Sequence, residues 1–253
     1  MSAVVVIPAR FGAVRFPGKP IARQTGKFLV QHVYERAADA RGIDRVIVAC
    51  DDRRIADAVD SFGGQWVMTR GDHASGTDRV AEVARGLNCD VVINVQGDEP
   101  EIEPESIETL ARLMGETRHP MGTLACPFAA LAQLGMPADS RDPNRVKVVI
   151  GGDRALYFSR SPIPFERNRV AEFDGPFLHL GIYGYRRSFL LQMAEMAPTA
   201  LERIEGLEQL RVLENGHSIA IAIVGRAAVG IDTPEDYAAF VKRQGVFVAS
   251  EEE

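Results

Sequence analysis

The feature that most constrains this chain is a series of uninterrupted apolar segments, each followed by a segment with helical periodicity. The apolar segments AVVVIPA, RVIVAC and DVVINVQ begin at Ala3, Arg45 and Asp90, and a shorter one, QWVMT, begins at Gln65. Apolar runs without alternation indicate strands that are covered on both faces, which is typical of parallel sheets between layers of helices. The sequence therefore predicts a three-layer α/β fold with a mostly parallel sheet.

Three segments between these strands have apolar side chains at helical spacing. They lie around residues 30–37, 55–62 and 80–87. The second is followed by Gly63-Gly64, which suits a helix C-terminus. We therefore expect a helix after each of the first three strands.

The second half of the chain has a different rhythm. From about 121–186 the runs VKVVI, ALYFSR and LHLGIYGY are typical of strands with turns between them, and we expect them to cover part of a crevice. After them, RIEGLEQLRVLENG predicts one helix over residues 203–216, SIAIAIV a strand, and TPEDYAAFVKR a helix capped by Thr233. No linker is evident, so we expect a single domain over 1–253 with this strand-rich elaboration.

Composition excludes several functional classes. The 253 residues carry a net charge of −6, whereas a nucleic-acid-binding surface needs a basic face. Three cysteines that are far apart, with no C-x-x-C pair, indicate reduced thiols of a cytosolic protein. No apolar stretch is long enough to span a bilayer and no basic leader precedes the first strand, so we expect a cytoplasmic protein without a membrane partner.

One loop departs from the acidic balance of the chain. The stretch IPARFGAVRFPGKPI, residues 7–21, contains Arg10, Arg15 and Lys19 but no carboxylate. A Walker A loop has four residues between its glycines and Ser or Thr after its lysine; this loop has five, and Pro20 follows its lysine. Three uncompensated cations after a parallel strand match the charge of a triphosphate, although the loop alone is also compatible with a solvated basic segment.

The position of this loop relative to a second motif predicts a binding crevice. Parallel sheets bind ligands outside the carboxyl ends of their strands. The cationic loop follows the first apolar segment, and QGDEP follows DVVINV in the same sense. We therefore expect both to open on one crevice.

Seven motifs in a fixed order give the chain a specific resemblance. After A-R-x-x-x-x-R-x-P-G-K-P come H-x-S-G-T-D-R, N-V-Q-G-D-E-P, A-L-Y-F-S-R-x-x-I-P, H-L-G-I-Y-G-Y, L-E-Q-L-R and G-I-D-T-P-E-D. This series, from about Val4 to Val241, resembles the 3-deoxy-manno-octulosonate cytidylyltransferases, or CMP-KDO synthetases. The resemblance implies a Rossmann-like nucleotidyltransferase fold.

It also implies a reaction, in which CMP passes from CTP to the anomeric 2-hydroxyl of 3-deoxy-manno-octulosonate (KDO) and pyrophosphate is released. By resemblance, Arg10, Arg15 and Lys19 hold the triphosphate, Asp98 and Asp232 hold Mg²⁺, and Asp98 and the three cations are the catalytic residues. Phosphoryl transfer depends mainly on positioning and electrostatics, and Mg²⁺ prefers oxygen ligands, so these residue types are suitable. From the residues alone, Asp232 also fits a carboxylate at a helix start.

The resemblance assigns nucleotide contacts to Ser75, Arg79 and Gln96 in addition to the three cations. Ser75 and Arg79 would read the cytosine edge, and Gln96 would contact the ribose or the base. The sequence Ser-Gly-Thr-Asp is also a good helix cap, and both roles are compatible.

The sugar acid is assigned by resemblance to a larger set, Arg160, His179, Tyr183, Glu208 and Gln209. Arg160 fits an anchor for the sugar carboxylate, and Glu208 with Gln209 fits hydroxyl groups. Without the resemblance, His179 is compatible with a structural histidine, and Glu208 with Gln209 is compatible with a solvated helix face.

Three positions depart from the family pattern. Ala13 and Val14 replace small hydroxyl residues before the second arginine, and Leu178 replaces a basic residue before the H-L-G histidine. Losing a positive charge beside the sugar would favour an 8-amino analogue of KDO, so this substrate is one alternative. Another CMP-sugar acid synthetase and a catalytically silent nucleotide-binding module are the others. The resemblance further implies a homodimer that supplies lipopolysaccharide or capsule synthesis.

Overall fold

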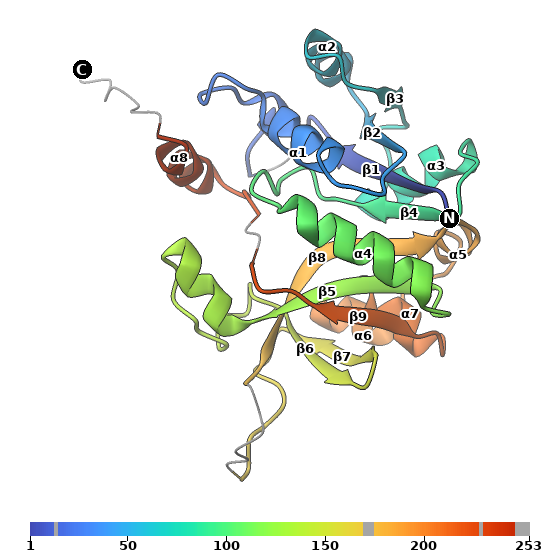
Figure 1. Cartoon of the computed structure of the whole chain (residues 1–253), viewed down its shortest axis with the longest axis vertical. Coiled ribbons are helices and arrows are strands. Elements are labelled where there is room, and N and C mark those ends of the chain that lie inside the picture. The colour runs from blue at the N-terminus through green and yellow to red at the C-terminus, as the bar shows by residue number, and fades with distance from the viewer. Residues whose placement is uncertain (13–14, 169–174, 228–229, 246–253) are drawn as a thin grey trace. The chain divides into compact units, whose positions relative to one another are not determined.

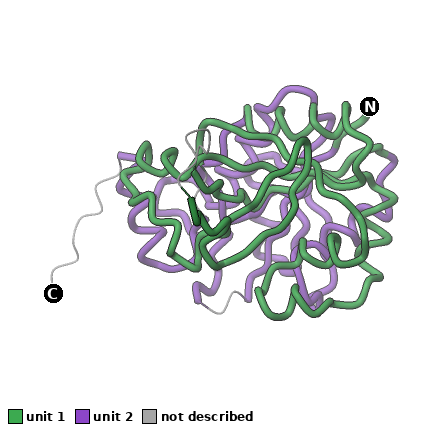
Figure 2. The backbone as a smooth tube through the Cα atoms, turned by 90° about the horizontal axis from the view of Figure 1, so that it is seen from below, with its two compact units in different colours: residues 1–3, 89–93, 105–227 green, residues 4–88, 94–104, 228–253 purple. Residues whose placement is uncertain are grey.

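The computed structural model describes residues 1–12, 15–168, 175–227 and 230–245. The chain divides into two compact units, which are coloured separately in Figure 2. Unit 2 comprises residues 4–88, 94–104 and 228–253, and unit 1 comprises 1–3, 89–93 and 105–227. The single-domain organisation expected from the sequence stays a prediction.

Unit 2 is built on three parallel strands, β1 (Ala3–Ala9), β2 (Arg45–Cys50) and β3 (Trp66–Met68). Their order is β3-β2-β1, with Val6 opposite Ile47 and Val48 opposite Trp66. The apolar residues of β1 and β2 are buried, as expected for strands between layers of helices. The predicted parallel pairing is therefore confirmed for these three strands.

The helices of unit 2 are α1 (Leu29–Ala38), α2 (Arg53–Ser61), α3 (Gly76–Arg85) and α8 (Pro234–Arg243), with a short 3₁₀ turn η1 (Lys19–Ile21) (Figure 1). All four helices were predicted, and α8 is capped by Thr233 as expected. Helix α3 begins earlier than its apolar periodicity suggests, because Ser75 caps it. Leu29 of α1 packs against Tyr237 and Phe240 of α8, which fixes α8 beside the cationic loop.

Unit 1 contains a mixed sheet in the order β4-β8-β5-β9-β7-β6. Its strands are β4 (Val91–Asn94), β5 (Met121–Pro127), β6 (Lys147–Gly151), β7 (Arg154–Ser159), β8 (Phe177–Arg186) and β9 (Ile219–Ile223). Strands β5 and β9 are parallel, whereas β8 is antiparallel to both β5 and β6, and β6 is antiparallel to β7. The strand-rich region predicted at about 121–186 is therefore present and largely antiparallel, with one unpredicted 3₁₀ segment, η2 (Phe128–Leu134).

Helix α4 (Pro104–Glu116) crosses one face of this sheet, and α6 (Ala200–Glu205) and α7 (Leu210–Glu214) lie behind it (Figure 1). Gly122 and Gly184 leave room for α4, because a Cβ at either position would lie within 3.0 Å of Met114. The remaining helix of this unit is α5 (Arg187–Met193). Among the described residues, no helix is long and apolar enough to cross a membrane.

The single helix predicted over 203–216 is wrong in one respect, since the structure divides it into α6 and α7. Gly206 closes α6 with a φ of 61°, a left-handed conformation that glycine adopts without steric cost. The three residues that follow Gly206 connect the two helices, and two of them, Glu208 and Gln209, belong to the predicted sugar set.

Candidate active site

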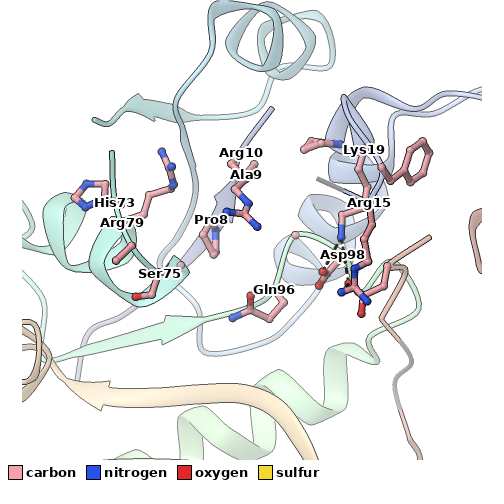
Figure 3. Close-up of a pocket in the computed structure, with 16 residues that line it drawn as sticks. Pro8, Ala9, Arg10, Arg15, Lys19, His73, Ser75, Arg79, Gln96 and Asp98 are labelled. Atoms are coloured by element: carbon pink, nitrogen blue, oxygen red, sulfur yellow. Dashed lines mark hydrogen bonds and ion pairs between the residues drawn. The ribbon is translucent and has the colours of Figure 1, made fainter. Parts of the chain in front are cut away.

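A cavity of about 300 Å³ opens in unit 2 at the carboxyl end of β1 (Figure 3). All eight residues predicted to bind nucleotide or metal line it: Arg10, Arg15, Lys19, Ser75, Arg79, Gln96, Asp98 and Asp232. They come from four segments that are distant in the sequence, and the expected common crevice is therefore confirmed. Their individual roles stay predictions.

One end of the cavity concentrates charge, as the dashed contacts at the right of Figure 3 show. The Lys19 ammonium donates to Asp98 Oδ2 at 2.8 Å and to the Ile231 carbonyl at 2.7 Å. It also lies 3.9 Å from Asp232 Oδ1, while Arg15 Nη2 lies 2.9 Å from that oxygen. Two remote carboxylates therefore share one ammonium.

A backbone hydrogen bond helps to bring the carboxylates of Asp98 and Asp232 close together. The amide of Ile231 donates to the carbonyl of Asp98 at 2.8 Å, which fixes the segment before α8 beside the turn after β4. The cap of α8 is formed by Thr233 and Asp236, whose side chains bond each other's amides. Asp232 stands directly before this cap, as the helix-start alternative has it, and its carboxylate also contacts the cations. Its role as a metal ligand stays a prediction.

The cationic loop is closed on itself before Lys19. Gly18 has a φ of 72°, and its amide donates to the Phe11 carbonyl at 3.0 Å. The ring of Phe11 packs against Gly18 on one side, and the Arg54 guanidinium lies 3.4 Å from the ring centroid. These contacts start η1 directly at Lys19 and orient its side chain into the cavity. The departures Ala13 and Val14 lie outside the described residues.

The other end of the cavity is formed by the start of α3, with Ser75, His73 and Arg79 at the left of Figure 3. Ser75 Oγ accepts from the amide of Asp78 at 3.1 Å, and the Asp78 carboxylate accepts from the Ser75 amide. The helix-cap interpretation of Ser75 is therefore confirmed. Its hydroxyl hydrogen is not used in that cap and can face a ligand.

Arg79 has a structural setting that the sequence did not reveal. Its side chain is 4% exposed, and its guanidinium donates to Asp51, to Thr69 Oγ1 at 2.5 Å and to the Arg70 carbonyl at 3.2 Å. Much of its hydrogen-bonding capacity is thus used inside the protein. Contact with a base through its remaining N–H groups stays a prediction.

Glu99, beside Asp98, is a buried residue that the sequence did not single out. It is 8% exposed, and its Oε2 has no hydrogen-bond partner among the described residues. Burial, followed by the charge of Asp98, raises the pKa of Glu99 to about 8. Close to pH 7 the Glu99 carboxyl is therefore largely protonated.

Gly97 provides a test of how closely the backbone packs in this cavity. A Cβ at this position would lie 2.7 Å from the Pro8 carbonyl oxygen, which is backbone and has no rotamer to change. We expect Gly97→Ala to lower the free energy of unfolding by about 1–3 kcal/mol, as overpacking does, when measured by urea denaturation. Gly71→Ala is the control, since nothing lies within 4 Å of its added Cβ. Equal stability of the two variants would contradict this close approach.

The five predicted sugar residues all lie in unit 1. The Arg160 guanidinium donates to the carbonyls of Glu205, Pro143 and Gly206, at 2.7, 2.9 and 3.4 Å. It thereby ties the end of β7 to the α6–α7 connection that carries Glu208 and Gln209. The structure thus brings Arg160 beside that connection, and its free N–H groups stay available for an anion.

The other members of the sugar set are largely buried in unit 1. His179 is 8% exposed, lies 3.0 Å from Thr123 Oγ1 and stacks edge-on against Phe158. Burial lowers the pKa of His179 to about 3, so it is a neutral hydrogen-bonding residue. The Tyr183 ring is 5.5 Å from the His179 ring, which places these two together.

Glu208 and Gln209 do not form a solvated helix face. The Gln209 side chain is buried, and its Nε2 has no hydrogen-bond partner among the described residues. Glu208 Oε1 lies 3.9 Å from Arg211, whose guanidinium is held by Glu202 at 2.5 Å. A buried amide donor of this kind is suited to a polar ligand, because leaving it unpaired is costly.

Comparisons with known proteins agree with this arrangement. The family model described as "Cytidylyltransferase" matches residues 4–219. A 3-deoxy-manno-octulosonate cytidylyltransferase of Syntrophotalea carbinolica is 50% identical, covering 93% of this chain and 96% of its own. The enzyme of the same name from Geobacter metallireducens is 47% identical, with coverages of 98% and 99%.

Solved structures show the same relationship. A CMP:2-keto-3-deoxy-manno-octonic acid synthetase complexed with CTP superposes with a TM-score of 0.89 at 42% identity, covering 97% of this chain and 99% of that one. An inositol-1-phosphate CTP transferase from T. maritima has a TM-score of 0.65 at 14% identity, covering 95% of each chain. The second similarity indicates the α/β fold alone.

Proposed function

The chain belongs to the cytidylyltransferase family, and from this premise we propose that it transfers CMP from CTP to the anomeric 2-hydroxyl of KDO, releasing pyrophosphate. The observation that carries the proposal is the cavity itself, in which Arg15 and Lys19 meet two carboxylates at one end, Arg10 also lines the cavity, and the capped start of α3 forms the other end. Such a cavity has room for a nucleotide whose triphosphate lies at the charged end. The relatives named for this reaction supply the substrate.

The charged end suits the chemical step. The sugar hydroxyl oxygen attacks the α-phosphorus, the bond from that phosphorus to the oxygen bridging to the β-phosphate breaks, and the hydroxyl proton is released. Negative charge accumulates on phosphate oxygens in the transition state. Arg10, Arg15 and Lys19 would stabilise it as preorganised donors, with the arginines gripping oxygens in pairs and Lys19 acting as a compact charge.

The donor set at this end also fits Mg²⁺. Among the described residues no three His, Cys, Asp or Glu side chains form a complete metal cage. Mg²⁺ bound with a nucleotide commonly uses only one or two carboxylates, and phosphate and water complete its shell. Asp98 and Asp232 would supply those carboxylates, and a bound Mg²⁺ would neutralise charge on the phosphates.

The ion pairs at the charged end imply an exchange of partners when nucleotide and metal bind. Lys19 and Arg15 now neutralise Asp98 and Asp232. When the nucleotide arrives, these cations turn to phosphate oxygens, and the carboxylates are released for the metal. CTP and Mg²⁺ are therefore expected to bind with positive coupling. Binding of CTP draws the cations away from the carboxylates that would hold Mg²⁺, and binding of Mg²⁺ frees the cations that would hold the phosphates.

The sugar residues support KDO as acceptor. Arg160 would bind the sugar carboxylate through the N–H groups that its backbone contacts leave free, and Glu208 and Gln209 would bind hydroxyls. His179 and Tyr183 would contribute neutral hydrogen bonds. The 8-amino analogue of KDO is an alternative acceptor that the neutral Leu178 favours.

The test is pyrophosphate release with Mg²⁺, measured for CTP, UTP, ATP and GTP against KDO, 8-amino KDO and a sialic acid. We expect turnover with CTP and an octulosonate, at least about 100-fold above the other combinations, because the unpaired buried polar groups would penalise wrong partners. Comparable turnover with sialic acid would refute the assignment of the acceptor. CTP binding without any turnover would instead support a silent binding module.

The proposal also covers the oligomeric state of the enzyme, its location in the cell and the use of its product. We propose that the chain works as a homodimer in the cytoplasm and that its product serves lipopolysaccharide or capsule synthesis. The homodimer is supported by the family resemblance, and size-exclusion chromatography with light scattering tests it directly.

A further inference from the structure

Asp51 is a carboxylate whose two oxygens contact two different walls of the cavity. It follows β2 directly and its side chain is 12% exposed. Its Oδ1 accepts from the Phe11 amide at 3.0 Å, and its Oδ2 accepts from Arg79 Nη2 at 3.0 Å. Asp51 does not line the cavity, whereas both of its partners belong to segments that do.

The first contact fixes the cationic loop. Phe11 follows Arg10, and while its amide donates to Asp51, its carbonyl accepts from Gly18. Gly18 in turn starts the turn that carries Lys19. The carboxylate therefore helps to determine where Arg10 and Lys19 stand relative to the sheet.

The second contact fixes the opposite wall. The Arg79 amide lies 3.4 Å from the Ser75 carbonyl, and its guanidinium also binds Thr69 and the Arg70 carbonyl. This holds the start of α3 against β1, where a Cβ on Gly76 would lie 3.4 Å from Pro8. The wall that would face the base is thereby set by the same carboxylate as the loop that would face the phosphates.

We infer that Asp51 is a positioning residue for the nucleotide, holding the triphosphate loop and the start of α3 at the separation that CTP requires. This inference rests on the proposed function. Asp57 shows the contrast, since it is exposed, pairs with Arg53 on α2 and does not line the cavity. Burial of both partners makes the Asp51–Arg79 pair sensitive to loss of one charge.

The test is Asp51→Asn, measured by calorimetric binding of CTP and of tripolyphosphate at a temperature well below the unfolding transition. The amide keeps one acceptor oxygen but presents N–H groups to a guanidinium. We expect CTP to bind roughly 10- to 100-fold more weakly, the loss typical of a charged hydrogen bond, and tripolyphosphate to lose less than about tenfold because it uses only the loop. Asp57→Asn, which breaks only an exposed ion pair with Arg53, is expected to bind both as the wild type does.

The outcomes separate this inference from the proposed function. Wild-type protein that fails to bind CTP would remove the proposed function. Wild-type protein that binds CTP, with Asp51→Asn binding equally well despite a lower melting temperature, would show a merely structural aspartate and overturn the inference. Equal losses for CTP and tripolyphosphate would also overturn it, since only one wall would then be involved.

Discussion

Asp98→Asn is expected to reduce Mg²⁺-dependent pyrophosphate release by about 10³-fold or more, while metal-free CTP binds at least as tightly as to the wild type. The loss follows because a carboxylate ligand of Mg²⁺ is removed, and metal-ion stabilisation contributes several kcal/mol to a phosphoryl-type transition state. The retained affinity follows because Lys19 no longer pairs with Asp98 at 2.8 Å and is free for phosphate. Turnover and calorimetric titration without metal measure the two effects.

The matched control for this prediction is Asp57→Asn, which breaks an exposed i,i+4 pair with Arg53 on α2. It removes the same charge at a distance from the cavity and is expected to change neither measurement. Substantial turnover in Asp98→Asn would refute the metal assignment. Weaker metal-free binding of CTP would contradict the exchange of ion pairs, because it would show that Asp98 attracts the nucleotide by itself.

The sequence predicted the elements of unit 2 well because their signals are local. The uninterrupted apolar run of β1 and the Thr233-Pro234 start of α8 depend on residues that are close in the chain, and both are confirmed. The break between α6 and α7 was missed although Gly206 was visible, since a glycine inside a helical pattern is often tolerated. Helix α4 was also not predicted, although Ile107, Leu110, Ala111 and Met114 give PESIETLARLMGE helical spacing.

For the site, strand ends were sufficient to place Lys19 and Asp98 at one crevice, because loops after parallel strands share one edge of a sheet, whereas Asp232 was assigned by resemblance. The pairing of side chains was beyond the sequence. The sequence alone is compatible with Arg79 as an exposed base-reading group, and only the fold shows that Asp51 accepts a hydrogen bond from it. A signal for Asp51 existed, since it closes an apolar run as Asp98 and Asp232 do.

The sugar set shows a different limit. Motif resemblance selected Gln209 and His179, but their burial depends on how β7, β8 and the α6–α7 connection pack, which no local pattern encodes. The structure contradicts the alternative of a solvated helix face for Gln209, whereas it agrees with the alternative of a structural setting for His179. Gln209 is buried with an unpartnered donor, whereas His179 has the protein contacts expected of a structural residue.

Lys19→Met changes the cation at the charged end instead of the carboxylate, and it is expected to have the second largest effect. Removing the ammonium deletes a preorganised donor at the charged end, so we expect kcat to fall by about 10²–10³-fold and the KM for CTP to rise. In the absence of nucleotide, however, Mg²⁺ should bind more tightly than to the wild type. Asp98 and Asp232 would lose a cation that lies 2.8 and 3.9 Å away, and a divalent ion would take its place.

Mn²⁺ titration followed by electron paramagnetic resonance measures this metal affinity without turnover. Lys19→Arg tests whether charge alone is enough, and we expect little recovery of activity. The lysine side chain is 13% exposed and its ammonium donates to Asp98 Oδ2 and the Ile231 carbonyl at once, which a planar guanidinium cannot reproduce in the same space. If Lys19→Met bound metal no better than the wild type, Lys19 would not compete with the cation.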